Sequence, residues 1–323
     1  MMKRVMTAAA LLLAVGGSAF AQNFPDHRMT MIIPFAAGGP TDLVGRLIAQ
    51  KMGDVLGQTI VVENVGGAGG MIGSNRVAHS APDGYTFGIG TVGTHAQSQT
   101  LHRHPIYNAA TDFTPVALIA EVPIVLVARK NLPVNNLKEF IAYTKKNQDT
   151  MKYGSGGVGA ASHLGCVVLN TAMGTHVTHV PYKGGGPAMQ DVLAGRIDFE
   201  CEIMSTAKSH IDAGALKAIA IMSKTRSPVE PNIPTTVEQG LDAQAYTWNA
   251  LFLPKGVPPA IVKKLNAAVV KAMHSPEVRD RLGKVGAQIA SDDRATPEYL
   301  GKFVKAEIKK WAPPIKASGA IVN

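Results

Sequence analysis

The chain has 323 residues, of which 46% are apolar and 17% are charged, and it contains 33 glycines. This composition excludes an intrinsically disordered protein, because disorder requires low hydrophobicity and high charge, and the length allows two domains of ordinary size. The net charge is +9; without Lys3 and Arg4, 30 basic residues face 23 acids, which leaves +7. The basic residues are scattered, so they do not indicate nucleic-acid binding, although a mildly basic surface suits acidic ligands.

The first 22 residues have the three parts of a secretory signal peptide. Lys3 and Arg4 precede an apolar run, Val5–Val15, and Ala19-Phe20-Ala21 follows. A charged start, a short apolar stretch and an A-x-A site predict a signal peptide at residues 1–21, cleaved after Ala21. An N-terminal core helix is the alternative. Beyond this segment no apolar run approaches the ~20 residues of a bilayer-spanning helix, so we expect a free, exported protein.

The elements expected next in chain order alternate between short β-rich runs and amphipathic segments. Strands are expected at Met29–Pro34, Thr59–Glu63, Thr86–Gly90, Val116–Ile119, Ile124–Ala128, His176–Val180, Ile197–Cys201, Leu216–Ile221 and Leu251–Leu253. Helices are expected at Asp42–Leu56, Leu137–Lys146, Ser162–Met173, Gly186–Ala194 and Thr206–Ala213, and loops at Phe35–Thr41 and Gly66–Gly73. Strands that alternate with helices predict parallel α/β sheets covered on both faces.

After Trp248 the pattern becomes helical. Pro259–Met273, Pro276–Val285 and Pro297–Ile315 each open with proline, which is typical of a first helical turn. We interpret the chain as two α/β lobes, crossed near residues 122–128 and again near 223–247. Lobe 1 is then residues 22–122 plus 235–323, and lobe 2 is residues 123–234.

The two cysteines are Cys166 and Cys201. In an oxidising compartment two cysteines allow one intramolecular pairing, so a disulfide is expected. Two buried, unpaired thiols remain the alternative, because the sequence does not show how closely the Cα atoms approach.

Two glycine-rich turns join a strand to a helix. Gly154–Gly159 reads G-x-G-x-x-G, but the acid about 20 residues later that a nicotinamide cofactor would need is missing. Such a turn still presents unpaired backbone N–H groups to an anion. Phe35–Asp42 forms a second glycine-rich turn of this kind, between the first expected strand and the first expected helix. If the lobes face each other, both helix N-termini can converge on one carboxylate.

Arrangements of catalytic or metal-binding residues are sparse. The G-x-S-x-G pattern fails at Tyr153, and His176/His179 lacks a third metal ligand at a suitable spacing. A serine hydrolase using Ser155 or Ser162 with His163 would lack an orienting acid.

The remaining polar residues that could belong to a site each allow a functional and a structural interpretation. His163 and His95 could each serve an anion or simply pack. Asp42 suits a helix cap better than a general base. Met204–Thr206 could line a cleft, and the alternative is an N-cap at Ser205 or Thr206.

Several stretches together resemble the extracytoplasmic solute receptors of tripartite tricarboxylate transporters, the Bug or TctC type. They are IIPFAAGGPTD (Ile32–Asp42), VVENVGGAGGMIGSNRVAHSAPDGYT (Val61–Thr86), SHLG (Ser162–Gly165), HVPYKGGGPAMQDVLAGRIDF (His179–Phe199) and IKASG (Ile315–Gly319). The resemblance implies a type II periplasmic-binding-protein fold, with two α/β lobes that close over a carboxylate held by loop amides. It also supports the disulfide.

Carried over by position, the resemblance implies a ligand-binding set: Phe35, Ala36, Ala37, Gly38, Gly39, Thr41, Asp42, Thr91, Thr94, His95, Ser155, Gly156, Gly157, Gly159, Ala160, Ala161, Ser162, His163, Tyr182, Lys183, Gly184, Met204, Ser205 and Thr206. It implies a monomeric periplasmic receptor that is not an enzyme and uses no cofactor or metal. The ligand would be a dicarboxylate or an aromatic carboxylate, delivered to the membrane subunits of the transporter. A hydrolase and a chemoreceptor-coupled sensor are the alternatives.

Overall fold

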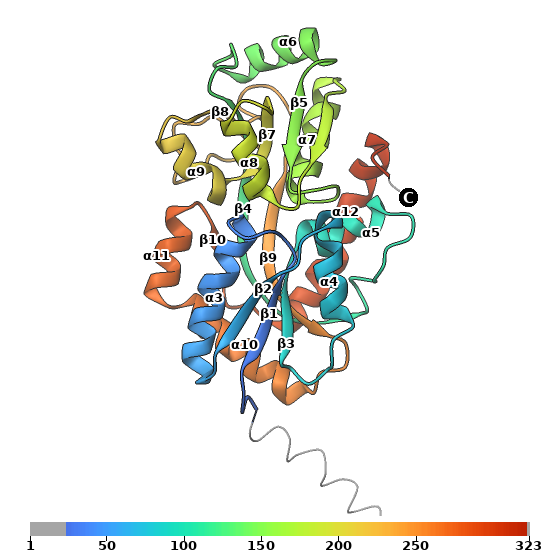
Figure 1. Cartoon of the computed structure of the whole chain (residues 1–323), viewed down its shortest axis with the longest axis vertical. Coiled ribbons are helices and arrows are strands. Elements are labelled where there is room, and N and C mark those ends of the chain that lie inside the picture. Colours follow the sequence, from blue (N-terminus) through green and yellow to red (C-terminus); the bar gives the residue numbers. More distant parts are fainter. Residues whose placement is uncertain (1–23, 322–323) are drawn as a thin grey trace, which may run out of the picture.

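A computed structural model describes residues 24–321 and shows two α/β lobes (Figure 1). The predicted signal peptide lies outside these residues. In lobe 1, the parallel strands β1 (Met29–Ile33), β2 (Ile60–Asn64) and β3 (Thr86–Thr91) lie in the order β2-β1-β3. The strand β9 (Tyr246–Pro254) pairs antiparallel with β3. Ile32 and Ile33, which point to opposite faces of β1, are both fully buried, as expected for a strand covered on both faces.

The sheet of lobe 2 is built around β7 (Phe199–Ile203) and β5 (Lys152–Ser155). The strand β5 pairs in parallel with both β7 and β6 (Thr178–Pro181). In the same lobe, the strand β8 (Leu216–Ile221) pairs with the long strand β4 (Phe113–Arg129).

The strand β4 belongs to both lobes. Its residues 113–123 pair with β9, and its residues 124–128 pair with β7. The prediction of two strands, Val116–Ile119 and Ile124–Ala128, is therefore wrong. Pro123 lies where β4 changes partner and β9 begins, and the strand continues through it.

The helices cover both sheets. They are α3 (Pro40–Leu56), α4 (Met71–Ala78), α5 (Ser98–Leu101), α6 (Leu137–Asn147), α7 (Ala161–Met173), α8 (Gly185–Leu193), α9 (Met204–Asp212), α10 (Pro259–Met273), α11 (Pro276–Lys284) and α12 (Pro297–Ser318). Short elements are a 3₁₀ turn at Ala68–Gly70, a π-helix at Gly93–Gln97 and the two-residue strand β10 (Gln288–Ile289).

Three sequence predictions of local structure need correction. The expected loop Gly66–Gly73 contains the 3₁₀ turn and the start of α4, because Gly69 and Gly70 take positive φ angles that glycine tolerates. The helix α9 begins at Met204 with Ile203 as its N-cap residue, so the N-cap at Ser205 or Thr206 is wrong. The strand expected at Leu251–Leu253 extends over Tyr246–Pro254, because it pairs along the whole first part of β4.

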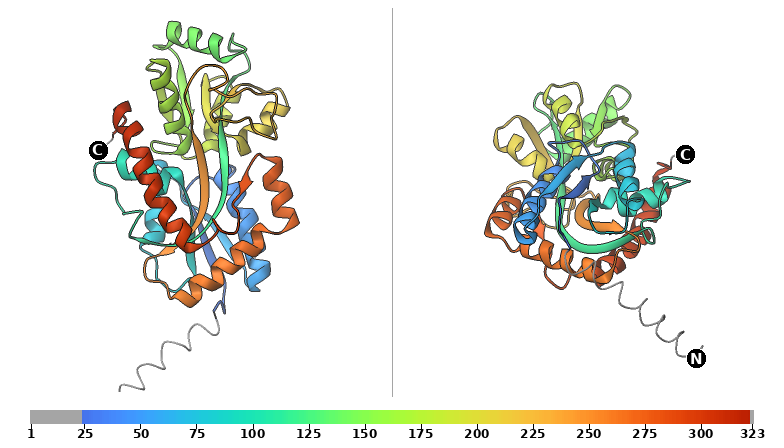
Figure 2. Two further views of the ribbon diagram at one scale, coloured as in Figure 1. Left: turned by 180° about the vertical axis from the view of Figure 1, so that it is seen from behind. Right: turned by 60° about the horizontal axis from the view of Figure 1, so that its bottom comes forward.

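The helix α12 connects the lobes on the far side of the molecule (Figure 2). It packs against β4 and α5 and reaches α7. Its buried Glu307 accepts hydrogen bonds from Trp248 Nε1 at 3.1 Å, Trp311 Nε1 at 3.2 Å and Tyr246 Oη at 2.5 Å. A buried carboxylate with three donors has its hydrogen-bonding needs met, so it fixes α12 to β9.

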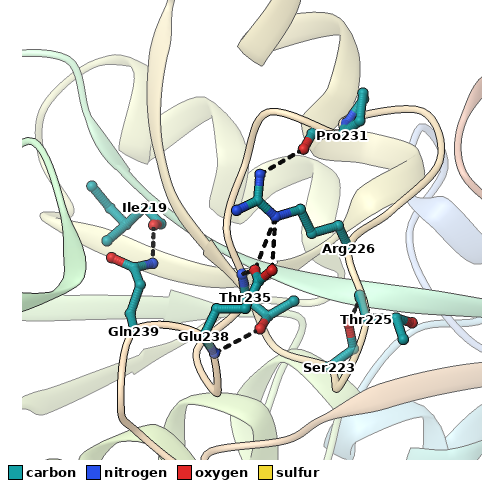
Figure 3. Close-up of polar contacts among 8 residues, drawn as sticks. All are labelled: Ile219, Ser223, Thr225, Arg226, Pro231, Thr235, Glu238 and Gln239. Atoms are coloured by element: carbon teal, nitrogen blue, oxygen red, sulfur yellow. Dashed lines mark hydrogen bonds and ion pairs between the residues drawn. The ribbon is translucent and has the colours of Figure 1, made fainter.

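The proline-rich stretch after β8 forms an ordered surface loop (Figure 3). Arg226 contacts the Glu238 carboxylate at 2.9 Å and donates to the Pro231 carbonyl at 2.9 Å. Glu238 also accepts from the Thr235 amide at 2.7 Å. Hydrogen bonds from Thr235 and Arg226 therefore hold the pKa of Glu238 below its usual range.

A disulfide joins α7 to β7. Cys166 and Cys201 are bonded, with their Cα atoms 5.3 Å apart. Both side chains are fully buried. The expected pairing is confirmed, and it fastens the helix that follows the second glycine-rich turn to the sheet beneath it.

Candidate functional site

A small closed cavity lies between the two lobes. Its volume is about 20 Å³, which is roughly the space of one water molecule. Both lobes contribute to its wall, which is lined by Phe35, Pro40, Thr41, Thr91, Gly156, Ala160, Ala161, Ser162, Gly185, Glu202, Ile203 and Thr247. Among these lining residues only Glu202 has an acidic side chain, and none is basic.

Four helices present their N-termini to this cavity. The N-cap residues of α3, α7, α8 and α9 are Gly39, Ala160, Gly184 and Ile203, and none of them caps its helix with a side-chain hydrogen bond. By contrast, Asn136 caps α6 and Thr296 caps α12. Uncapped first turns leave N–H groups unpaired, and the helix dipole places partial positive charge there. The cavity is therefore suited to a negatively charged group.

The first loop is held by Asp42, which is buried. Its carboxylate accepts from the Gly38 amide at 3.0 Å, Arg46 Nε at 2.9 Å and Asn64 Nδ2 at 2.9 Å. Asn64 Nδ2 also donates to the Phe35 carbonyl at 2.9 Å. Burial alone would raise the pKa of Asp42, but these hydrogen bonds outweigh it and leave the pKa below its ordinary value. Asp42 is thus a first-turn acid that fixes the loop.

The second loop is held by its own helix. Ser162 Oγ accepts from the Gly156 amide at 3.0 Å, and His163 Nδ1 accepts from the Gly159 amide at 3.2 Å. Ser155 Oγ lies 2.6 Å from His179 Nε2 and also accepts from the Gly157 amide at 3.1 Å. These bonds keep the turn in place while the first amides of α7 stay free.

The histidines near the site are structural. His163 and His179 stack with their ring centroids 4.2 Å apart. Burial lowers the pKa of His163 to about 3, helped by the charge of His179, and burial lowers the pKa of His179 to about 4. His95 stacks on Phe252 at 4.0 Å, and burial lowers its pKa to about 3. All three rings are therefore neutral at neutral pH and add no cation to the cavity.

The predicted binding residues fall into three groups. Seven line the cavity: Phe35, Thr41, Thr91, Gly156, Ala160, Ala161 and Ser162. Five line a groove of about 380 Å³ between α3 and α9: Gly38, Gly39, Asp42, Ser205 and Thr206. The other twelve lie outside both linings: Ala36, Ala37, Thr94, His95, Ser155, Gly157, Gly159, His163, Tyr182, Lys183, Gly184 and Met204.

The third group supports the loops or joins them. The Ala36 amide donates to the Lys183 carbonyl at 3.0 Å, which ties one lobe to the other. Tyr182 Oη donates to Asp191 at 2.5 Å, and burial followed by this bond raises the pKa of Tyr182 to about 12. Met204 is fully buried.

Five lining residues were missed by the sequence reasoning: Pro40, Gly185, Glu202, Ile203 and Thr247. Gly185 directly follows the predicted site residues Tyr182–Gly184, so the sequence could have indicated it as a further site residue. Glu202 carried a signal of its own, because an acid inside an apolar strand must be paired or neutralised. Thr247 enters the cavity only because β9 begins earlier than expected.

The loops of the two lobes touch beside the cavity. A Cβ added to Gly93 would lie 2.7 Å from the Gly159 carbonyl oxygen, and one added to Gly69 would lie 1.9 Å from the Val158 oxygen. With the cavity no larger than a water molecule, the structure is in a closed arrangement. A larger ligand can enter only when the lobes separate.

Comparisons with known proteins now identify the family. The family model described as tripartite tricarboxylate transporter family receptor matches residues 44–320. The chain belongs to this receptor family. Its predicted fold class is confirmed by solved structures of periplasmic binding proteins.

Three solved structures illustrate the match. The receptor is 41% identical to MatC from Rhodopseudomonas palustris with bound malate, with a TM-score of 0.88 over 90% of this chain and 100% of that chain. It is 38% identical to the periplasmic binding protein BugD, with a TM-score of 0.90 over 92% and 99%. A second R. palustris protein, solved with adipate, is 34% identical, with a TM-score of 0.87 over 92% and 98%.

Two further findings concern residues 24–321. No helix in this range is both long and apolar enough to cross a membrane. Within the same residues, no group of three or more His, Cys, Asp or Glu side chains is arranged to hold a metal ion.

Proposed function

We propose that the protein is a receptor that captures a small dicarboxylate in the cavity between its lobes. The observation that carries this proposal is the convergence of four uncapped helix N-termini on a cavity whose lining includes no basic side chain. Backbone amides fixed by the fold would replace the water around a carboxylate with charge-assisted hydrogen bonds. An aromatic carboxylate is the other class that the sequence favours.

The bound ligands of two similar proteins favour the dicarboxylate. Malate and adipate, found in those structures, each carry two carboxylates, and a closed cavity with helix N-termini from both lobes can bind one group from each side. Because the cavity in this structure holds only about one water, capture would begin in an open form and end with the lobes closed around the ligand, in a cavity enlarged to the size of that ligand.

The closing units would be residues 22–122 plus 235–323 and residues 123–234. The chain crosses between them in β4 and returns in the segment before β9. In this proposal the mature receptor begins after Ala21, works as a periplasmic monomer and delivers its ligand to the membrane subunits of a tripartite tricarboxylate transporter. Membership in the receptor family supports this role.

The serine-hydrolase alternative finds no support in the geometry. Ser155 pairs with His179 rather than His163, and its side chain is fully buried. Among the described residues, no carboxylate is hydrogen-bonded to the ring of His179 to orient it, as a catalytic triad requires. We therefore propose capture without chemistry, which an ester-hydrolysis assay on purified protein would contradict by showing turnover.

A melting-shift screen of small carboxylic acids, followed by calorimetry, tests the proposal. A ligand at 100 times its Kd stabilises a protein by about 2.7 kcal/mol, so a true ligand should raise the Tm by several degrees. The diamide of the same ligand keeps its size but loses its charge, and should give no shift. Equal binding of acid and diamide would refute anion capture.

A further inference from the structure

Glu202 places an acid in the wall of the proposed anion site. The residue is fully buried on the central strand β7 and lines the cavity. One oxygen, Oε1, accepts from the Ile203 amide at 2.7 Å, whereas Oε2 has no hydrogen-bond partner. The carboxyl lies against the first residue of α8, because a Cβ added to Gly185 would come within 2.9 Å of Oε2. An unpartnered oxygen thus lies among the helix N-termini.

A second acid lies beside it. Glu200 shares a face of β7 with Glu202, since side chains two residues apart on a strand point the same way. Glu200 is also fully buried, and outside the Glu200–Glu202 pair neither of its oxygens has a hydrogen-bond partner. Cys201, between them, points to the opposite face, where it is bonded to Cys166 of α7. The two carboxyls are therefore enclosed together under α8.

Neither carboxyl is neutralised by a cation. The titratable or charged groups on the neighbouring elements and their flanks are Glu121, Arg129, Lys152, Tyr153, His163, Tyr182, Lys183, Asp191, Arg196, Asp198, Lys208, His210 and Asp212. Arg129 pairs with Asp198, Arg196 with Asp191, and Lys208 with Asp212 and Glu230. None of these groups is hydrogen-bonded to Glu200 or Glu202.

Two adjacent buried carboxyls without a cation cannot both be ionised, because each charge would lack both water and a counter-ion. Burial and the neighbouring Glu202 raise the pKa of Glu200 well above its usual range. Burial also raises the pKa of Glu202, whereas the Ile203 amide and the Glu200 carboxyl, which can donate to Glu202 once it is itself protonated, act in the opposite direction. The pair therefore titrates as a unit, and it keeps a proton at a pH above that at which an ordinary glutamate ionises.

We propose that Glu202 is a specificity-determining residue that, when protonated, donates a hydrogen bond from Oε2 to a carboxylate oxygen of the ligand. The inference rests on the proposed function, because it assigns a donor to the same anion site. An ionised Glu202 would repel the anionic ligand. A protonated Glu202 instead adds a hydrogen-bond donor to the cavity that the helix N-termini already face. The receptor would thus bind its ligand together with a proton.

The direction of the pH effect follows from this linkage. A bound anion stabilises the protonated form, so the pKa of Glu202 is higher in the complex than in the free receptor. Affinity is then constant at low pH and falls as the pH rises between these two values, by about tenfold per pH unit at most.

The test is calorimetry with malate, adipate and succinate from about pH 6 to 9, in pairs of buffers with different ionisation enthalpies. We expect the wild type to bind more weakly at high pH and to take up more than zero and up to one proton per ligand. Glu202→Gln keeps a neutral donor, so it should bind near wild-type strength at low pH, with neither pH dependence nor proton uptake. Glu298→Gln removes an exposed acid on α12 and should behave as wild type.

The outcomes separate this inference from the proposed function. If none of the three acids binds the wild type at any pH, the proposal of dicarboxylate capture fails and this inference fails with it. If the wild type binds them without proton uptake, or if Glu202→Gln keeps the wild-type pH profile, only the inference is overturned. It is also overturned if Glu202→Gln abolishes binding of malate but spares succinate, since Glu202 would then be an ionised acceptor for the hydroxyl group. Melting curves of each variant establish that it is folded.

Discussion

Replacing Gly93 by alanine should weaken ligand binding by obstructing closure of the lobes. The new Cβ would lie 2.7 Å from the Gly159 oxygen, 3.2 Å from the Ala160 Cα and 3.2 Å from the Ala161 nitrogen. All three atoms are backbone atoms of the opposite lobe, so none can move aside alone. Over-packing of this kind costs about 1–3 kcal/mol, and only the closed form bears it.

Because the ligand is held by the closed form, that cost is subtracted from its binding free energy. The affinity should fall by about 5- to 150-fold, which calorimetry with the tightest-binding dicarboxylate would measure. Gly283→Ala is the matched control: Gly283 is an exposed glycine in α11 where an added Cβ meets nothing within 4 Å. If Gly93→Ala binds within twofold of the wild type, or if Gly283→Ala weakens binding equally, the closure argument is wrong.

Three further predictions concern stability, each measured by denaturant unfolding. Reducing the Cys166–Cys201 bond, which closes a separation of 35 residues, should lower the free energy of unfolding by about 3–4 kcal/mol; no change would show that the bond constrains nothing. Asp42→Asn should cost about 1–3 kcal/mol, and since the pKa of Asp42 is lowered, its contribution is present above the unfolded-state pKa and disappears as the pH falls. The pKa values of Glu200 and Glu202 are raised, so the pair stabilises the fold at low pH and this contribution disappears as the pH rises. Above the ordinary glutamate range the wild type should lose up to about 1.4 kcal/mol per pH unit for each carboxyl that stays protonated only in the folded state. Glu200→Gln should lose less, and equal losses would contradict the buried pair.

Much of the fold could be predicted because local signals agreed with tertiary packing. The proline-initiated helices α10, α11 and α12 begin where the sequence placed them. The predictions failed where a distant partner decides the outcome. Two short strands were expected at Val116–Ile119 and Ile124–Ala128, yet β4 is continuous because β9 pairs with one part of it and β7 with the other.

The site was predictable to the extent that it consists of backbone. Glycine-rich turns before helices indicated anion-binding amides, and Thr41, Gly156 and Ser162 do line the cavity. Side chains that reach it from strand ends could not be found in the same way. Whether Glu202 faces a cavity, a helix or solvent depends on which face of β7 meets α8, and that is set by the packing of the whole lobe.

A crystal structure of the receptor with its tightest-binding dicarboxylate tests the central claim most directly. The account predicts carboxylate oxygens about 2.7–3.2 Å from backbone nitrogens at the starts of α3, α7 and α8, in the cavity lined by Thr41, Ala161 and Gly185. A carboxylate held by a lysine or arginine side chain, or bound outside this cavity, would contradict it.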